Sequence, residues 1–223
     1  MQVLSISLVF EILSLLTAVI CYLQKGNKLI SLFIPFLFLT VIVEFLGRWA
    51  IYPKGLGKYG LYNLFTATEF IFYGFIFFIN LENKYFKRIV LFFIPFFTIA
   101  ALSNLFFIQG LNKTFNSYTL VFGSFFIVIF CCFYFYESVS TDKIDLRLSR
   151  QPFFWISSGL LIFYLGSVII NALFQYLSST EFKLEGIKIY TIINRSLNVI
   201  LYTFFSIAFF LCPNNKKTSL SQS

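Results

Sequence analysis

The chain has 223 residues, of which 59% are hydrophobic and 12% are charged, and its mean hydropathy is +0.85. A soluble domain carries about 25% charged residues, so this composition excludes an ordinary water-soluble domain. The formal net charge is +8, but the basic residues stand in small groups between apolar runs. That pattern is typical of membrane orientation and not of a nucleic-acid-binding face, so we expect no nucleic acid among the partners.

Seven apolar runs with short loops between them fill nearly the whole chain. A helix needs about 20 apolar residues to cross the hydrocarbon core of a bilayer. Because backbone amides in lipid must be satisfied within their own segment, we predict that each run is a helix. In chain order, the predicted spans are residues 3–23, 29–52, 60–81, 89–108, 115–136, 152–177 and 187–212.

These spans predict an all-α, polytopic membrane protein in which residues 1–223 form a single seven-helix transmembrane domain. The longest predicted loop, 139–151, has room for a turn or a short surface helix only. The N-terminus has neither a basic segment nor a small-residue cleavage site, so the first span is expected to be a retained helix and not a removed signal peptide.

The lysine and arginine residues between the spans predict the orientation, since short cytoplasmic loops carry an excess of both. One side carries Lys25, Lys28, Lys84, Lys87, Arg88, Lys143, Arg147, Arg150, Lys216 and Lys217, and the other carries Lys54, Lys58, Lys113, Lys183 and Lys188. The larger set predicts the cytoplasmic side. We therefore expect the N-terminus outside and the C-terminus in the cytoplasm.

Polar residues inside five of the spans recur at steps of three and four residues, which places each set on one helix face. The third span shows the pattern with Tyr62, Thr66, Glu69 and Tyr73. An ionised side chain that faces lipid costs several kcal/mol. We therefore expect these faces to point into the bundle, with the lipid bilayer around the apolar faces.

Charged residues of separate spans are predicted to converge in the outer half of the membrane, roughly 12–14 Å below the surface at about 1.5 Å per residue. The predicted ligand-binding residues are Glu11, Glu44, Arg48, Glu69, Tyr73, Asn171, Arg195 and Asn198. One interpretation is contact between helices, including a Glu44–Arg48 pair, and Arg48 alone could reach the headgroups. The other is an outward-facing pocket for a small polar ligand. Polar contacts in membranes average only about 0.6 kcal/mol, which favours the pocket.

The remaining polar and aromatic residues receive structural interpretations. Asn63, Asn104 and Asn116 are interpreted as helix-end or loop residues, and the phenylalanines of the fourth span predict a lipid-facing wall. The four cysteines are expected to be reduced apolar fillers and not a disulfide framework. They are Cys21, Cys131, Cys132 and Cys212.

The chain contains no histidine, which excludes histidine-based acid–base catalysis and imidazole ligation of zinc or haem. Phosphate-binding and serine-nucleophile motifs are also missing, and the seventh span has no buried lysine for a retinal Schiff base. We expect no catalytic residues, no metal and no cofactor. An intramembrane enzyme that uses carboxylates stays open as an alternative.

Four strings carry a resemblance to known proteins: Tyr62-Asn63-Leu64-Phe65 leading to Glu69-Phe70, residues 107–113, residues 154–160 and residues 198–202. Together they resemble an uncharacterised group of small seven-helix membrane proteins of Bacteroidetes-type bacteria that is associated with sensor histidine kinases. The resemblance implies a sensory role in the bacterial cytoplasmic (inner) membrane, with a histidine kinase or another membrane partner on a separate polypeptide. It transfers no functional residue.

The predicted arrangement is also similar to that of SWEET-type sugar transporters, which have seven helices and an outer N-terminus. Phe45-Leu46-Gly47 and Tyr164-Leu165-Gly166 form a short internal echo, but the PQ motif of that family is missing. A transporter needs polar groups near the midplane, whereas the charges here are predicted nearer the outside. The favoured hypothesis is therefore a membrane-embedded sensor for a small polar ligand. A small-solute transporter, a carboxylate enzyme and an accessory subunit remain alternatives.

Overall fold

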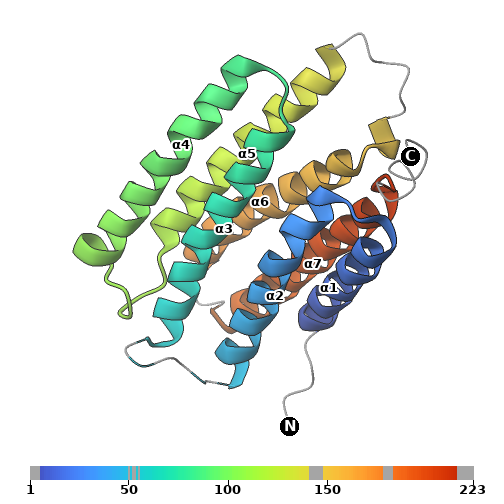
Figure 1. Cartoon of the computed structure of the whole chain (residues 1–223). Coiled ribbons are helices and arrows are strands. Elements are labelled where there is room, and N and C mark those ends of the chain that lie inside the picture. Colours follow the sequence, from blue (N-terminus) through green and yellow to red (C-terminus); the bar gives the residue numbers. More distant parts are fainter. Residues whose placement is uncertain are drawn as a thin grey trace, which may run out of the picture. The chain divides into compact units, whose positions relative to one another are not determined.

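A computed structural model describes residues 6–49, 51, 54, 56–140, 148–177 and 183–214, with the side chains of 174–177 and 183–187 outside the description. The α-helices of this part are α1 (Ile6–Lys25), α2 (Lys28–Trp49), α3 (Lys58–Asn80), α4 (Lys84–Ser103), α5 (Ser117–Ser140), α6 (Pro152–Leu177) and α7 (Lys183–Leu211). A short π-helix, η1 (Asn104–Ile108), continues α4, and a 3-10 turn, η2 (Leu148–Arg150), precedes α6. Figure 1 shows these elements in chain order.

The predicted all-α fold is confirmed. Within the described residues, seven helices are long and apolar enough to cross a membrane, as expected of an integral membrane protein. The sixth predicted span, 152–177, coincides with α6. Predicted residues 3–5, 50 and 52 lie outside the described part of the chain.

The largest shift in a helix boundary is at α4, which begins at Lys84 and not at the predicted residue 89. The side chain of Asn83 caps this end and accepts a hydrogen bond from the backbone N–H of Tyr85 at 2.8 Å. From α5, the carboxylate of Glu137 accepts backbone N–H groups of Glu82, at 2.9 Å, and of Asn83. A helix requires satisfied backbone groups and not apolar side chains, so α4 extends beyond its apolar run. α5 and α7 likewise exceed their predicted spans, by four residues each, at Ser140 and Lys183 respectively.

The chain divides into two compact units. The terminal unit consists of Met1–Phe38 and Asp145–Ser223, and the central unit consists of Leu39–Ile144. The boundary therefore falls within α2. That residues 1–223 act as one domain stays a prediction.

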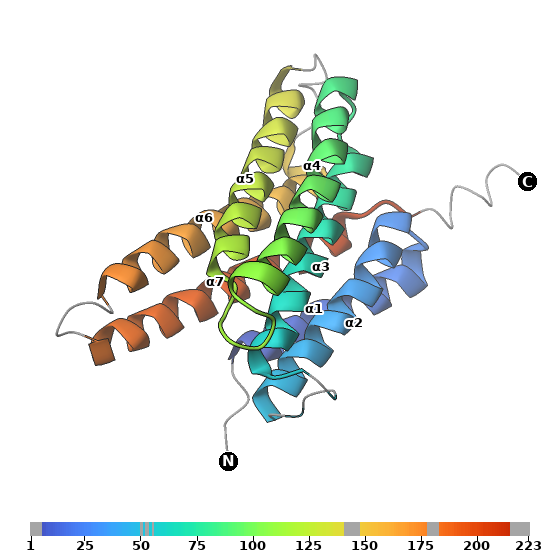
Figure 2. The same ribbon diagram turned by 90° about the vertical axis from the view of Figure 1, so that its left-hand side faces the viewer.

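In the terminal unit, α7 packs against both α6 and α1, and Figure 2 shows α6 and α7 running next to each other. The ring of Phe33, in α2, lies 5.2 Å from Phe205 and 5.5 Å from Phe209 of α7. At the end of α7, the ammonium of Lys25 donates to the carbonyl of Phe210, and the amide of Asn27 donates to Pro213. A cation at the C-terminus of a helix donates hydrogen bonds to the last carbonyl groups and interacts favourably with the helix dipole.

In the central unit, α3 contacts α4 and α5, and α4 contacts α5 (Figure 1). Aromatic rings form the core: Phe70 stacks on Phe97 with centroids 3.7 Å apart. Phe92 and Phe96, from the predicted lipid-facing wall of the fourth span, are 64% and 49% exposed. Phe97, at 2%, belongs to the core instead, because one face of α4 packs against α3 and α5.

Candidate functional site

Glu44, Arg48 and Tyr62 form a charged cluster in the central unit. Arg48 and Glu44, one helical turn apart on α2, form a hydrogen-bonded ion pair. The Tyr62 hydroxyl of α3 donates to the other oxygen of the Glu44 carboxylate at 3.2 Å. The side chains of Arg48 and Glu44 are 26% and 24% exposed. The carboxylate thus has a partner on each oxygen, and both side chains of the pair remain partly exposed.

Gly47 permits this arrangement of α2 and α3. A Cβ atom added at Gly47 would lie 2.7 Å from the Cζ atom of Tyr62, closer than real Cβ atoms approach other atoms. The missing side chain therefore provides the space that the Tyr62 ring occupies beside Glu44. A larger residue at position 47 must displace that ring.

Glu69 and Tyr73 lie further along α3. Tyr73 is fully buried, whereas Glu69 is half-buried. The carboxyl group of Glu69 interacts electrostatically with the Tyr73 hydroxyl. The residue spacing that predicted one shared face for this helix thus brings these two groups together one turn apart.

The other four predicted site residues belong to the terminal unit. Glu11 of α1 is 4% exposed, and the serines on its face, Ser7 and Ser14, are 5% and 0% exposed. The polar face of α1 that these three residues share is therefore buried. Burying a carboxyl group in an apolar helix costs free energy, whereas burying an apolar side chain at the same position does not.

Asn171 connects α6 to α7, since it accepts a hydrogen bond from the Tyr190 hydroxyl at 3.4 Å. Asn198 donates to the carbonyl of Asn194 in its own helix at 2.9 Å. The side chain of Arg195 is exposed, and no ion pair joins it to a described residue. The two units thus hold four of the eight predicted residues each, and their convergence on one pocket stays a prediction.

A polar network that the residue pattern did not predict lies at one end of the central unit. The Asn63 amide donates to the carbonyls of Leu111 and Thr114, both at 3.0 Å, and its oxygen accepts the backbone N–H of Asn116 at 2.9 Å. Asn63 is 1% exposed. One side chain of α3 therefore fixes the loop between α4 and α5.

Asn104 and Asn116 continue this network. The Asn104 amide nitrogen lies within hydrogen-bonding distance of Gln109, Asn116 and Thr119 side-chain oxygens. Asn104 directly follows α4, at the start of η1, and Asn116 directly precedes α5. Both lie at helix ends as expected, but both are buried, at 6% and 2% exposed. The glycine at position 110 was the signal for this network in the sequence. Its φ is 74°, and the tight turn that it permits brings the two helix ends together.

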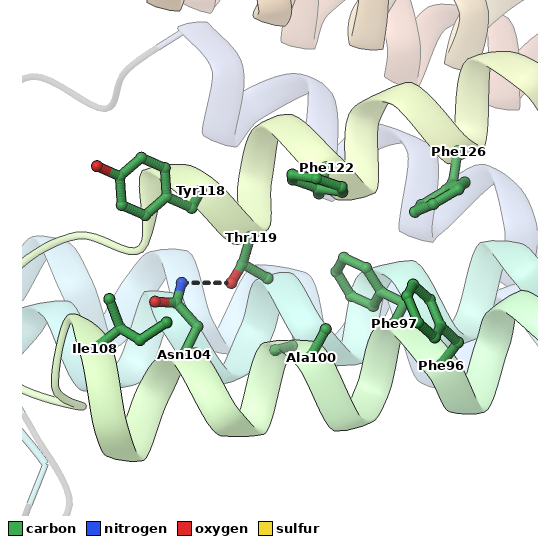
Figure 3. A pocket seen from close by; sticks show the side chains of 10 residues that line it. Phe96, Phe97, Ala100, Asn104, Ile108, Tyr118, Thr119, Phe122 and Phe126 are labelled. Atoms are coloured by element: carbon green, nitrogen blue, oxygen red, sulfur yellow. Dashed lines mark hydrogen bonds between the residues drawn. The ribbon is translucent and has the colours of Figure 1, made fainter.

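A cavity of about 370 Å³ lies beside Asn104 between α4, η1 and α5. Figure 3 shows its wall, with aromatic rings from both helices and the Asn104–Thr119 hydrogen bond at one end. Its walls are almost entirely apolar. This cavity lies wholly within the central unit.

Cys212 directly follows α7 and is 3% exposed. Burial raises the pKa of its thiol from 9.0 to about 12; the ammonium of Lys25 opposes this shift, and Cys21 adds to it. The thiol is therefore protonated at neutral pH and is not a nucleophile. Like Cys212, Cys21 and Cys131 are buried, whereas Cys132 is exposed.

Among the described residues, no cluster of three or more histidine, cysteine, aspartate or glutamate side chains is arranged to hold a metal ion. Comparison with models of known protein families, with characterised proteins and with solved structures finds no match to this chain. The function must therefore be inferred from the chemistry of the described groups.

Proposed function

We propose that the chain is a membrane-embedded receptor that binds a small polar ligand at its charged cluster and signals to a separate protein. The ion pair between Glu44 and Arg48, with Tyr62 on the second carboxylate oxygen, carries this proposal. Ionisable residues within membrane spans are costly and typically functional. This pair is about one quarter exposed, so a ligand can reach it.

Stability alone is a weak reason for this pair. An i,i+4 ion pair contributes about 0.3–0.5 kcal/mol when exposed, much less than the cost of placing two charges in membrane helices. A guanidinium binds carboxylates and phosphates in two-point geometry, and a carboxylate binds amines. A ligand with an ionised group would compete for one member of the pair and release the other. Such a ligand shifts the helix packing if it binds one arrangement better.

The signalling partner and the orientation are part of the same proposal. The resemblance to small seven-helix proteins supports a histidine kinase or another membrane partner, and the distribution of lysine and arginine supports a cytoplasmic C-terminus in a bacterial inner membrane. In this orientation the start of α4, with Lys84, Lys87 and Arg88, faces the cytoplasm. These side chains would contact either the partner or anionic headgroups.

Ligand-dependent stabilisation tests the proposal. The protein in lipid nanodiscs is screened against amino acids, organic acids and other polar metabolites by thermal unfolding, and hits are repeated on Glu44→Gln and Arg48→Gln. We expect both variants to lose the ligand-induced shift. Arg88→Gln serves as a control, because Arg88 is exposed and lies outside the cluster.

Two results would contradict the proposal. A ligand whose stabilisation survives both substitutions binds elsewhere, and repeating the measurement on Glu69→Gln and Arg195→Gln would test the other predicted residues. Flux of a stabilising ligand into liposomes would instead support the transporter alternative.

A further inference from the structure

A second cavity of the central unit lies where the turn between α3 and α4 meets the last turns of α5. It measures about 290 Å³, and its lining consists of Glu82, Asn83, Phe86, Tyr136, Glu137 and Ser140. Candidate membrane spans end or begin here, at Asn80, Lys84 and Ser140. Residues at the ends of a span lie at the level of the lipid headgroups. The cavity therefore lies at that level, and none of its lining residues belongs to the charged cluster.

Two aromatic residues contribute to the lining. The ring centroids of Phe86 and Tyr136 lie 6.0 Å apart, with the ring planes at 77°. Phe133 stacks on Phe86 at 4.5 Å, while Tyr136 is 65% exposed, as is typical of a tyrosine at a membrane interface. Aromatic faces attract organic cations within about 6 Å of the ring centroid. The chain makes such a contact itself at the same end of α3 and α4, where the Lys87 ammonium lies 5.7 Å from the Phe78 ring centroid.

Two acidic side chains line the same cavity, and neither is enclosed: Glu82 is exposed and Glu137 is half-buried. One oxygen of Glu137 accepts the backbone N–H groups of Glu82 and Asn83, which holds the two acidic residues together. These hydrogen bonds require neither the Glu82 side chain nor the Tyr136 ring. Like charges that share a cavity repel each other, and the six lining residues include no lysine or arginine. The lining therefore favours a cation.

We propose that this cavity binds the primary ammonium group of an aminophospholipid, phosphatidylethanolamine. An ammonium donates up to three hydrogen bonds, and the two carboxylates and the Ser140 hydroxyl are acceptors for them. A quaternary ammonium has no such donors and is recognised by aromatic faces. Mg²⁺ requires an octahedron of oxygen ligands, which a lining with two aromatic residues disfavours.

The side chains beside the cavity complement the phosphate of the same headgroup. Lys84 and Arg88 are exposed and lie one turn apart on α4, directly after the lining residue Asn83. Cationic side chains bind phosphate groups, so an acidic cavity beside two basic residues matches the two charges of a zwitterionic lipid. The volume of about 290 Å³ is just below the usual range of about 300–1,000 Å³ for ligand cavities, which suits a headgroup whose acyl chains remain in the bilayer.

Lipid titration of the full chain in detergent micelles tests the proposal. Phosphatidylethanolamine, phosphatidylcholine and phosphatidylglycerol with identical acyl chains are added, and bound lipid is counted by native mass spectrometry. We expect phosphatidylethanolamine to bind at least about tenfold more tightly than the other two, because phosphatidylcholine lacks the N–H donors and phosphatidylglycerol lacks the cation. Its binding should also slow hydrogen exchange at residues 82–86 and 136–140.

Matched variants separate recognition of the ammonium from general contact with lipid. Glu82→Gln removes one charge and leaves the hydrogen bonds of Glu137 in place, since Glu82 contributes only its backbone N–H to them. It should weaken binding of phosphatidylethanolamine about tenfold and leave phosphatidylcholine unchanged, whereas Glu69→Gln, outside the cavity, should change neither. Tyr136→Leu should weaken binding roughly threefold, as expected for an exposed cation–π contact. Its control is Tyr118→Leu, because Tyr118 lies in the same helix, is 64% exposed and does not line this cavity.

Four outcomes would overturn the proposal. Equal affinity for phosphatidylethanolamine and phosphatidylcholine would mean that the ammonium donors are not recognised. Undiminished binding by Glu82→Gln, or slowed hydrogen exchange only outside residues 82–86 and 136–140, would place the lipid elsewhere. Free ethanolamine that binds as tightly as the lipid would identify a soluble amine as the ligand. Displacement of the lipid by Mg²⁺, but not by K⁺ at equal ionic strength, would identify a site for a divalent cation.

Discussion

Replacement of Asn63 by leucine should destabilise the central unit by about 3 kcal/mol. The side chain is 1% exposed and makes three hydrogen bonds, to the carbonyls of Leu111 and Thr114 and from the N–H of Asn116. Each intramolecular hydrogen bond contributes about 1 kcal/mol, and buried backbone groups left unpaired cost at least that much. Polar side-chain contacts between membrane helices average only about 0.6 kcal/mol because the unfolded state finds other partners. Here the partners are backbone groups of the loop between α4 and α5, and backbone groups in folded proteins are nearly always paired.

The assay is unfolding in lipid bicelles, combined with hydrogen exchange of the loop at residues 109–116. Asn80→Leu provides a matched control in the same helix, because the Asn80 amide donates only to Ile76, one turn earlier on α3. We expect the control to change the free energy of unfolding by less than about 0.5 kcal/mol, as for most substitutions away from a buried network. If Asn63→Leu were no more destabilising than the control, and loop protection were unchanged, the network would not hold the loop.

Three further predictions follow from groups outside this network. Glu137→Gln should increase hydrogen exchange of the Glu82 and Asn83 amides, directly before α4, and cost about 1 kcal/mol, because the charge of their shared acceptor is lost. Unchanged exchange of these two amides would refute this role of Glu137. In a variant with Cys212 as its only cysteine, maleimide labelling at pH 8 should be on the order of a thousandfold slower when folded than in SDS, since burial raises the pKa of this thiol from 9.0 to about 12. Because burial disfavours the thiolate, the stability present below pH 9 is lost as pH rises from 9 toward 12. Labelling at equal rates would show an accessible thiol. Gly47→Leu should displace Tyr62 and abolish any ligand response that requires Glu44, whereas Gly47→Ala should show a smaller form of the same effect.

The sequence by itself determined the number, type and approximate position of the membrane helices. This succeeds because lipid offers no hydrogen bonds to the backbone, so an apolar run of sufficient length has only one conformation available. Helix ends were less well determined. α4 begins five residues before its predicted span because the Asn83 side chain accepts an amide of its first turn and Glu137 fixes the two residues just before it. Glu137 lies more than fifty residues away in the chain.

Only the tertiary structure decided which polar residues are buried and which of them contact one another. Residue spacing places Glu11 and Arg195 on faces of their own helices, but it does not determine what covers those faces: Glu11 is 4% exposed, whereas Arg195 is exposed. Asn104 and Asn116 are unremarkable as separate helix-end residues. Their shared, incompletely satisfied network beside an apolar cavity exists because a turn with a positive φ at Gly110 folds one helix end onto the next. Contacts of that kind depend on backbone geometry, which local composition does not contain.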